Sequence, residues 1–95
     1  MQNIPEKSLD RLFRAIASLE TKEEVAAFFE DVCTITELID MSQRLETALM
    51  LDKGENYQTI SKEIGISTAT ISRVSKCINY GSGGYKIVID RLNEK

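Results

Sequence analysis

The residues best suited to chemistry lie between Thr68 and Asn79, on one side of a predicted helix. At about 100° per residue, the apolar side chains of this stretch fall on one face and small polar or cationic side chains on the other. Small residues let a helix approach base edges, hydroxyl groups bond to bases or phosphates, and cationic groups neutralise phosphates. The polar face consists of Thr68, Ala69, Ser72, Lys76 and Asn79, with Arg73 at its edge. This pattern is typical of a helix that enters the major groove of DNA.

The residues just before this helix fit the same function. A short helix is predicted over residues 57–64, and Gly65 is expected to end it with a positive φ. Ser67 is placed to cap the second helix. Residues 57–79 are therefore interpreted as a helix-turn-helix, whose first helix crosses the DNA backbone. The candidate phosphate contacts on that first helix are Gln58, Thr59 and Lys62.

Other interpretations of these residues stay open. Polar side chains on an exposed helix face are usually only solvated, and a short helix pair can serve packing alone. The net charge of −3 favours a protein-interaction module that keeps the fold without binding an operator. The charge distribution favours DNA: residues 1–55 carry 6 Lys and Arg against 12 Asp and Glu (6 − 12 = −6), and residues 56–95 carry 6 against 3 (6 − 3 = +3).

The composition argues against catalysis and metal binding. The sequence contains no His, the commonest general base and metal ligand, and no Gly-rich phosphate loop. Cys33 and Cys77 are too far apart in sequence for a metal cluster or a disulfide framework, so both are interpreted as free thiols. We therefore expect no enzymatic activity, no metal and no cofactor.

The sequence also lacks signals for a membrane or for export. It contains no run of about 18 apolar residues, the minimum for a transmembrane helix. The stretch MQNIPEKS lacks the apolar segment of a signal peptide. The expected location is the cytoplasm.

The remaining residues predict an all-α fold of six helices in one domain, residues 1–95. Capping boxes are expected to begin the first three helices, and Gly54 is expected to end the third. A last helix is predicted within residues 85–95, after a short Gly and Ser run. The three boxes are Asn3 with Glu6, Thr21 with Glu24, and Thr34 with Glu37.

The helices predicted in residues 1–54 have apolar faces that need a partner. Leu12, Phe13, Val25 and Phe28 belong to these faces. They could pack onto their own chain or onto a second copy. A two-helix DNA reader gains affinity and specificity from paired half-sites, so we expect a homodimer with residues 1–54 as its dimerisation helices.

The chain resembles the Trp-repressor family, in particular its YerC/YecD-type branch. The similarity covers about residues 8–94 and is sharpest in LMLDKGE at 49–55 and EIGISTATISR at 63–73. The resemblance implies six helices per subunit, an intertwined homodimer with interlocked N-terminal helices, and a DNA reader made by the fourth and fifth helices. The DNA contacts that it implies are Gln58, Thr59, Lys62, Thr68, Ala69 and Ser72.

The resemblance also implies an effector pocket between the third helix and the recognition helix. In tryptophan-binding members two arginines clasp the corepressor, and Arg44 and Arg73 match them, while Thr34 matches a contact at the start of the third helix. Val74 stands where the family has Gly, and Cys77 replaces a small hydroxyl residue. Because a β-branched side chain fills the indole slot, tryptophan is not the expected corepressor, and an unidentified small-molecule effector stays open.

The sequence thus predicts a homodimeric transcriptional regulator, a repressor, that reads double-stranded DNA. Thr68, Ala69 and Ser72 are expected to read base edges. A simpler role stays open for the two arginines, in which Arg44 pairs with Asp40 or with a carboxylate of the partner chain and Arg73 contacts phosphate directly. The residues expected to position the DNA backbone are Gln58, Lys62, Arg73 and Lys76.

Overall fold

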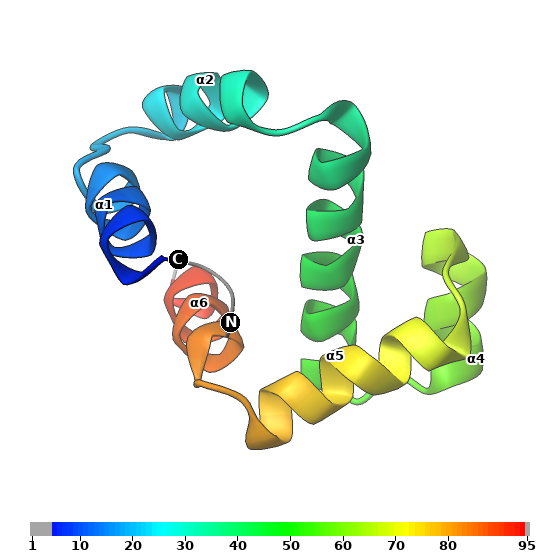
Figure 1. Ribbon diagram of the computed structural model, residues 1–95. Coiled ribbons are helices and arrows are strands. Elements are labelled where there is room, and N and C mark those ends of the chain that lie inside the picture. The colour runs from blue at the N-terminus through cyan, green and yellow to red at the C-terminus, as the bar shows by residue number, and fades with distance from the viewer. Residues whose placement is uncertain (1–4, 95) are drawn as a thin grey trace. The chain divides into compact units, whose positions relative to one another are not determined.

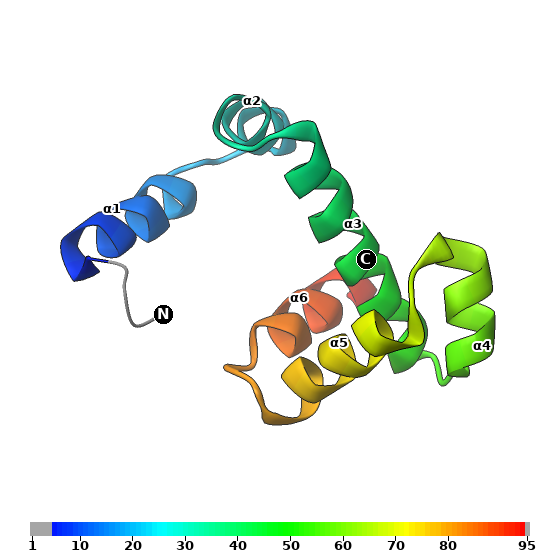
Figure 2. The same cartoon turned by 45° about the vertical axis from the view of Figure 1, so that its right-hand side comes forward.

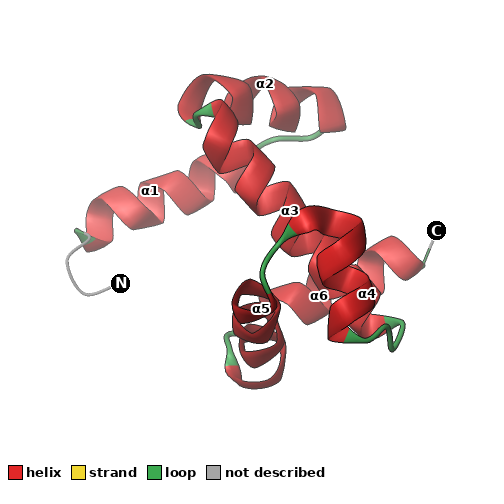
Figure 3. Cartoon of the chain, turned by 90° about the vertical axis from the view of Figure 1, so that its right-hand side faces the viewer, coloured by secondary structure: helices red, strands yellow, loops and turns green. Residues whose placement is uncertain are grey.

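The computed structural model describes residues 5–94, and within that range its regular structure is entirely helical (Figures 1 and 3). The α-helices are α1 (Glu6–Ala17), α2 (Lys22–Val32), α3 (Ile35–Asp52), α4 (Tyr57–Ile60), α5 (Thr68–Tyr80) and α6 (Gly84–Asn93). A π-helical turn, Ser61–Gly65, extends α4. The prediction of an all-α chain with six helices is confirmed.

The chain divides into two compact units, one up to Leu38 and one from Ile39 onward. The first contains α1, α2 and the start of α3, and the second contains the rest of α3 with α4 to α6. No helix within residues 5–94 is long and apolar enough to cross a membrane. The same residues hold no group of three or more His, Cys, Asp or Glu side chains placed to bind a metal ion.

Side-chain caps mark where α2 and α3 begin. At α3 the predicted capping box is complete: the Glu37 N–H donates to Thr34 Oγ1 (3.1 Å), and the Thr34 N–H donates to the Glu37 carboxylate (2.8 Å). At α2 the Glu24 N–H donates to Thr21 Oγ1 (3.1 Å), but the Glu24 carboxylate accepts from the Glu20 N–H instead (2.8 Å). The box predicted at Asn3 lies outside the described residues.

In the first unit, α1 and α2 bury no side chain. Phe13 is 52% exposed, and Leu12, Val25 and Val32 are exposed as well. Strongly amphipathic helices normally bury their apolar face, since that burial supplies most of their stability in proteins. Within the described part of their unit, residues 5–38, these two helices therefore lack a cover.

The second unit has its own core, to which three helices contribute. Ala48 of α3, Val74 of α5 and Ile89 of α6 form a buried cluster. Figures 1 and 2 show α5 crossing the C-terminal part of α3, with α6 beside it. The partly buried side chains around the cluster are Leu49, Leu51, Ile78 and Tyr85. Helix α5, which carries most of the candidate DNA contacts, is thus fixed on its apolar side.

The last helix differs from its prediction. It begins at Gly84, and of its apolar residues Ile89 is buried whereas Ile87, Val88 and Leu92 are exposed. Ile87 and Ile89 are two positions, and so about 200°, apart around the helix, and both therefore cannot face one core.

Candidate nucleic-acid interface

The segment predicted as a short helix, residues 57–64, is helical, but its winding changes part-way. Helix α4 covers Tyr57–Ile60, and a wider π-helical turn, Ser61–Gly65, follows directly. The Ser61 hydroxyl donates to the carbonyl oxygen of Ile66 (2.6 Å) and ties this turn to the connection that follows it. Asn56 caps α4, with its Oδ1 accepting from the Thr59 N–H (2.8 Å). This cap was not predicted, although Asn is a favoured cap residue.

The connection to α5 follows its prediction. Gly65 has φ +80°, a left-handed conformation that glycine adopts without the steric cost that a Cβ brings. Ile66 and Ser67 are extended, and Ser67 Oγ accepts from the Thr70 N–H (3.2 Å). The predicted positive φ and the predicted Ser cap are both confirmed. Together they set where α5 begins.

Helix α5 has one buried face and one face open to solvent. Ile71 is fully buried and Val74 is 3% exposed. Ile60 of α4 is fully buried too, and α4 and α5 contact each other. On the open side Ser72 is half-buried, and the exposed members are Thr68, Ala69, Arg73, Lys76 and Asn79.

The candidate contacts before α5 are also accessible. Gln58 and Lys62 are exposed, and Thr59 is half-buried, with its N–H held by the Asn56 cap. The structure thus puts all eight candidate DNA contacts on two helical segments that pack together, and none of the eight is buried.

The charge on these segments suits a polyanion. Helix α5 contains Arg73 and Lys76 but no Asp or Glu. Within residues 5–94 the one side-chain ion pair joins Arg14 to Asp10 (3.0 Å). Both residues belong to α1 and not to the candidate DNA reader. The cations of α5 and of the preceding turn therefore keep their charge available for phosphate groups.

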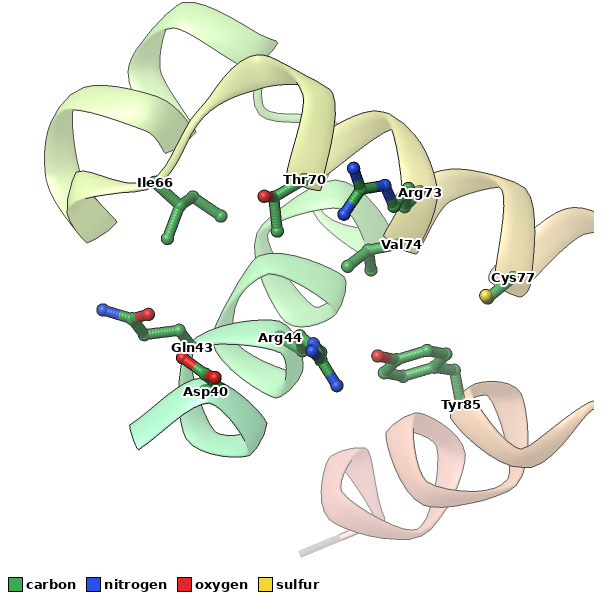
Figure 4. A pocket seen from close by; sticks show the side chains of 9 residues that line it. All are labelled: Asp40, Gln43, Arg44, Ile66, Thr70, Arg73, Val74, Cys77 and Tyr85. Carbon is green, nitrogen blue, oxygen red and sulfur yellow. The ribbon is translucent and has the colours of Figure 1, made fainter. Parts of the chain in front are cut away.

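Behind α5 the second unit forms a cavity of about 410 Å³ that is partly open to solvent (Figure 4). Helix α3 forms one wall, α5 a second, and Tyr85 of α6 closes the side. Four of the five residues predicted for an effector pocket line it. The lining residues are Asp40, Gln43, Arg44, Ile66, Thr70, Arg73, Val74, Cys77 and Tyr85.

The fifth predicted pocket residue, Thr34, does not line this cavity. Its hydroxyl is the cap of α3, accepting from the Glu37 N–H. The structure therefore gives Thr34 a role in starting the helix that carries Arg44.

Val74 belongs both to the core and to the cavity wall. It packs with Ala48 and Ile89, and its side chain also faces the cavity. Space remains in front of it, bounded by the two arginines and the Tyr85 ring (Figure 4). The cavity is thus present with a valine at position 74, and the valine side chain limits its shape.

Arg44 is not paired with Asp40: no ion pair joins the two, although both line the cavity. The other pairing considered for Arg44, with a carboxylate of the partner chain, stays a prediction. Burial raises the pKa of the Tyr85 hydroxyl above its usual 10.0; negative charge at Cys77 adds to this shift and Arg44 opposes it. The Cys77 thiol is exposed and free, and Cys33 is free as well.

Several cavity residues were not found from the sequence. Thr70 lies four residues before Val74 and seven before Cys77, so helical spacing alone could have added it to the pocket. Tyr85 could not have been found in this way. It follows a Gly and Ser run, and only the return of α6 against α5 brings its ring to the cavity.

Known proteins similar to this chain indicate its family. The model of the Trp repressor protein family matches residues 7–93. The uncharacterized protein YerC of Bacillus subtilis (strain 168) is 51% identical over 88 residues, which are 93% of this chain and 85% of that protein. A TrpR-like protein from Eubacterium eligens ATCC 27750 has a crystal structure with a TM-score of 0.89 and 45% identity, covering 98% of this chain and 96% of that one. A crystal structure of a candidate Trp repressor from Staphylococcus aureus gives a TM-score of 0.88 and 44% identity, covering 99% of this chain and 94% of that one. The chain belongs to the Trp repressor family, as a TrpR-related protein of the YerC type.

Proposed function

We propose that this protein is a transcriptional repressor that binds a specific double-stranded DNA sequence as a homodimer. Its reader is a helix-turn-helix made of α4, the π-helical turn and α5. The observation that carries the proposal is the division of α5 into a buried apolar face and an open face of small, hydroxyl-bearing and cationic residues. Membership of the Trp repressor family supports a repressor role.

The proposed DNA contacts of α5 differ with position along the helix. The N-terminal residues of a recognition helix meet base edges, so Thr68, Ala69 and Ser72 read the sequence, with the Ala69 methyl suited to a thymine methyl group. Arg73 and Lys76 lie further along and neutralise phosphates. On the preceding segments Gln58, Thr59 and Lys62 contact the backbone and fix the register.

The homodimer is supported by the first unit. The apolar residues of α1 and α2 have no cover there, and a second copy of the same helices offers a complementary apolar surface. Replacing Phe13, which is 52% exposed, with Asp should shift the protein from dimer to monomer in analytical ultracentrifugation. The matched variant Arg11→Asp changes charge on the same helix without removing apolar area and should remain dimeric.

The cavity behind α5 is proposed as an effector site. Two guanidinium groups that pair with no carboxylate within residues 5–94 border a space of about 410 Å³, which suits a small molecule that carries an anionic group. Arg73 also lies at the edge of the DNA-facing side of α5. A ligand that fixes Arg73 therefore alters the DNA reader directly.

A salt titration tests the DNA-binding proposal. The affinity of the wild type for its selected duplex should fall with salt, with a log–log slope of about −0.9 per neutralised phosphate. Lys76→Gln, which removes a charge from the open face of α5, should weaken binding and make the slope shallower by about 0.9 per protomer. Lys86→Gln on α6 removes the same charge from an exposed site outside the reader and should change neither quantity.

The same experiment addresses the protein-interaction module. That function predicts no enrichment of any duplex and no difference between Lys76→Gln and Lys86→Gln. Pull-down partners that survive nuclease treatment would then identify the module's real ligand.

A further inference from the structure

Tyr80, the last residue of α5, exposes a large aromatic ring to solvent. Its side chain is 87% exposed, more than any other large apolar residue in the part of the chain described. Tyrosine and other aromatic residues are enriched where a protein surface meets a partner, because they combine apolar area with a polar tip. Its position on α5 indicates which partner that is.

Tyr80 lies on the DNA-facing side of α5. It follows Lys76 by four residues and Arg73 by seven, which places all three on one stripe of a helix. The same stripe continues back to Ala69, eleven residues before Tyr80. The open face of α5 thus ends in a phenol.

The end of α5 fixes where this phenol sits. The Gly81 N–H donates to the carbonyl oxygen of Cys77 (2.9 Å) and closes the last turn. A Cβ at position 81 would collide with that same backbone oxygen, so a glycine is needed directly after Tyr80. Tyr80 is therefore the terminal residue of a capped helix, and its ring stands at a defined distance from the first turn.

That distance exceeds the width of the groove. Tyr80 follows Thr68 by twelve residues, so the two are separated by about 18 Å along the helix axis. The major groove is about 12 Å wide. With Thr68 and Ala69 at the base edges and α5 lying across the groove, the far end of α5 reaches the sugar–phosphate rim and not the bases.

We propose that Tyr80 is an uncharged backbone contact, whose hydroxyl donates a hydrogen bond to a phosphate oxygen and whose ring packs against the adjacent deoxyribose. The contact holds the C-terminal end of α5 in register while its N-terminal end reads the sequence. This inference rests on the proposed DNA-binding function and assigns one further residue to it.

The test compares Tyr80→Phe and Tyr80→Ala with the wild type on the selected duplex and on an unrelated duplex, at several salt concentrations. Loss of a hydrogen bond to a charged acceptor predicts that Tyr80→Phe weakens binding by about tenfold or more on both duplexes. Tyr80→Ala should weaken it further. Because the phenol carries no charge, the salt slope of Tyr80→Phe should match the wild type, unlike that of Lys76→Gln.

The outcomes separate this contact from the wider proposal. If the wild type binds DNA and Tyr80→Phe binds it with the same affinity, the Tyr80 contact is refuted and the DNA-binding function is not. If the wild type does not bind DNA, both are refuted. If Tyr80→Ala is monomeric in sedimentation while Tyr80→Phe binds normally, Tyr80 belongs to an interface between protomers and the contact is refuted. Melting temperatures within about 2 °C of the wild type confirm that both variants fold.

Discussion

Arg44 on α3 and Arg73 on α5 face one cavity from two sides, and neither guanidinium is paired with a carboxylate in residues 5–94 (Figure 4). Arg44 belongs to the helix that supports the reader, and Arg73 belongs to the reader itself. A ligand between them therefore contacts both the supporting helix and α5. This geometry offers the proposed effector a direct physical route to the proposed DNA-binding face.

Tryptophan should not act as that ligand. Val74 borders the cavity beside Arg73, and its branched side chain limits the room for an indole. Millimolar tryptophan should leave the melting temperature and the DNA affinity of the wild type unchanged. A ligand present far above its Kd stabilises the native state, so a rise of several degrees in the melting temperature would contradict this expectation.

Val74 should contribute to stability independently of any ligand. It is 3% exposed and packs with Ala48 and Ile89, so Val74→Ala leaves a cavity in the core. The free energy of unfolding should fall by about 2 kcal/mol. Val88→Ala removes the same atoms from a site that is 43% exposed and should change it by less than about 0.5 kcal/mol. Urea denaturation at one fixed protein concentration measures both, and equal losses would show that Val74 is not a core residue.

Gly65 should resist substitution for a conformational reason. Its φ is +80° and nothing lies within 4 Å of a Cβ built there, so the cost of Gly65→Ala is backbone strain without collision. The expected loss is about 1 kcal/mol. Gly84 also has open space around a Cβ, but it lies in α6 and its φ is not positive, so Gly84→Ala should be neutral or stabilising by up to about 1 kcal/mol. The same denaturation experiment compares them, and the reverse order would refute the assigned turn.

Alkaline pH should weaken the fold through Tyr85. Burial, the largest cause, and negative charge at Cys77 raise the pKa of its hydroxyl in the folded state above 10.0, so the folded protein holds this proton more tightly than the unfolded chain does. The resulting stabilisation is complete below pH 10 and is lost as pH rises through the folded-state pKa. The free energy of unfolding should therefore fall less steeply above pH 10 in Tyr85→Phe than in the wild type. Identical slopes would show that Tyr85 ionises as freely in the folded protein as in the unfolded one.

Local signals in the sequence were sufficient for most of the helix boundaries and for the open polar face of α5. Thr34, Ser67 and Gly65 act through bonds or φ values within a few residues of themselves, so their roles follow from residue type and spacing. The open face of α5 follows from the 3.6-residue period for the same reason. The π-helical turn after Ile60 could not be predicted in this way, because it has no distinct residue pattern.

The cavity could not be predicted from local patterns, because contacts between segments distant in the sequence form it. The family resemblance supplied Arg44, Arg73, Val74 and Cys77, which all line it. It also supplied Thr34, which the structure places at a helix cap. Neither the local residue pattern nor the family resemblance predicted Tyr85, because its place depends on how α6 packs against α5.

The most direct test of a sequence-specific reader is selection from a random duplex library, with the wild type and with Ser72→Ala carried in parallel. Ser72 lies on the open face in the second turn of α5, where side chains meet base edges. The wild type should enrich a motif with two-fold symmetry, and Ser72→Ala should relax the preference at one position in each half-site while keeping the rest. Failure of the wild type to enrich any sequence, or an identical motif for both proteins, would contradict the assignment of α5 as the element that reads DNA.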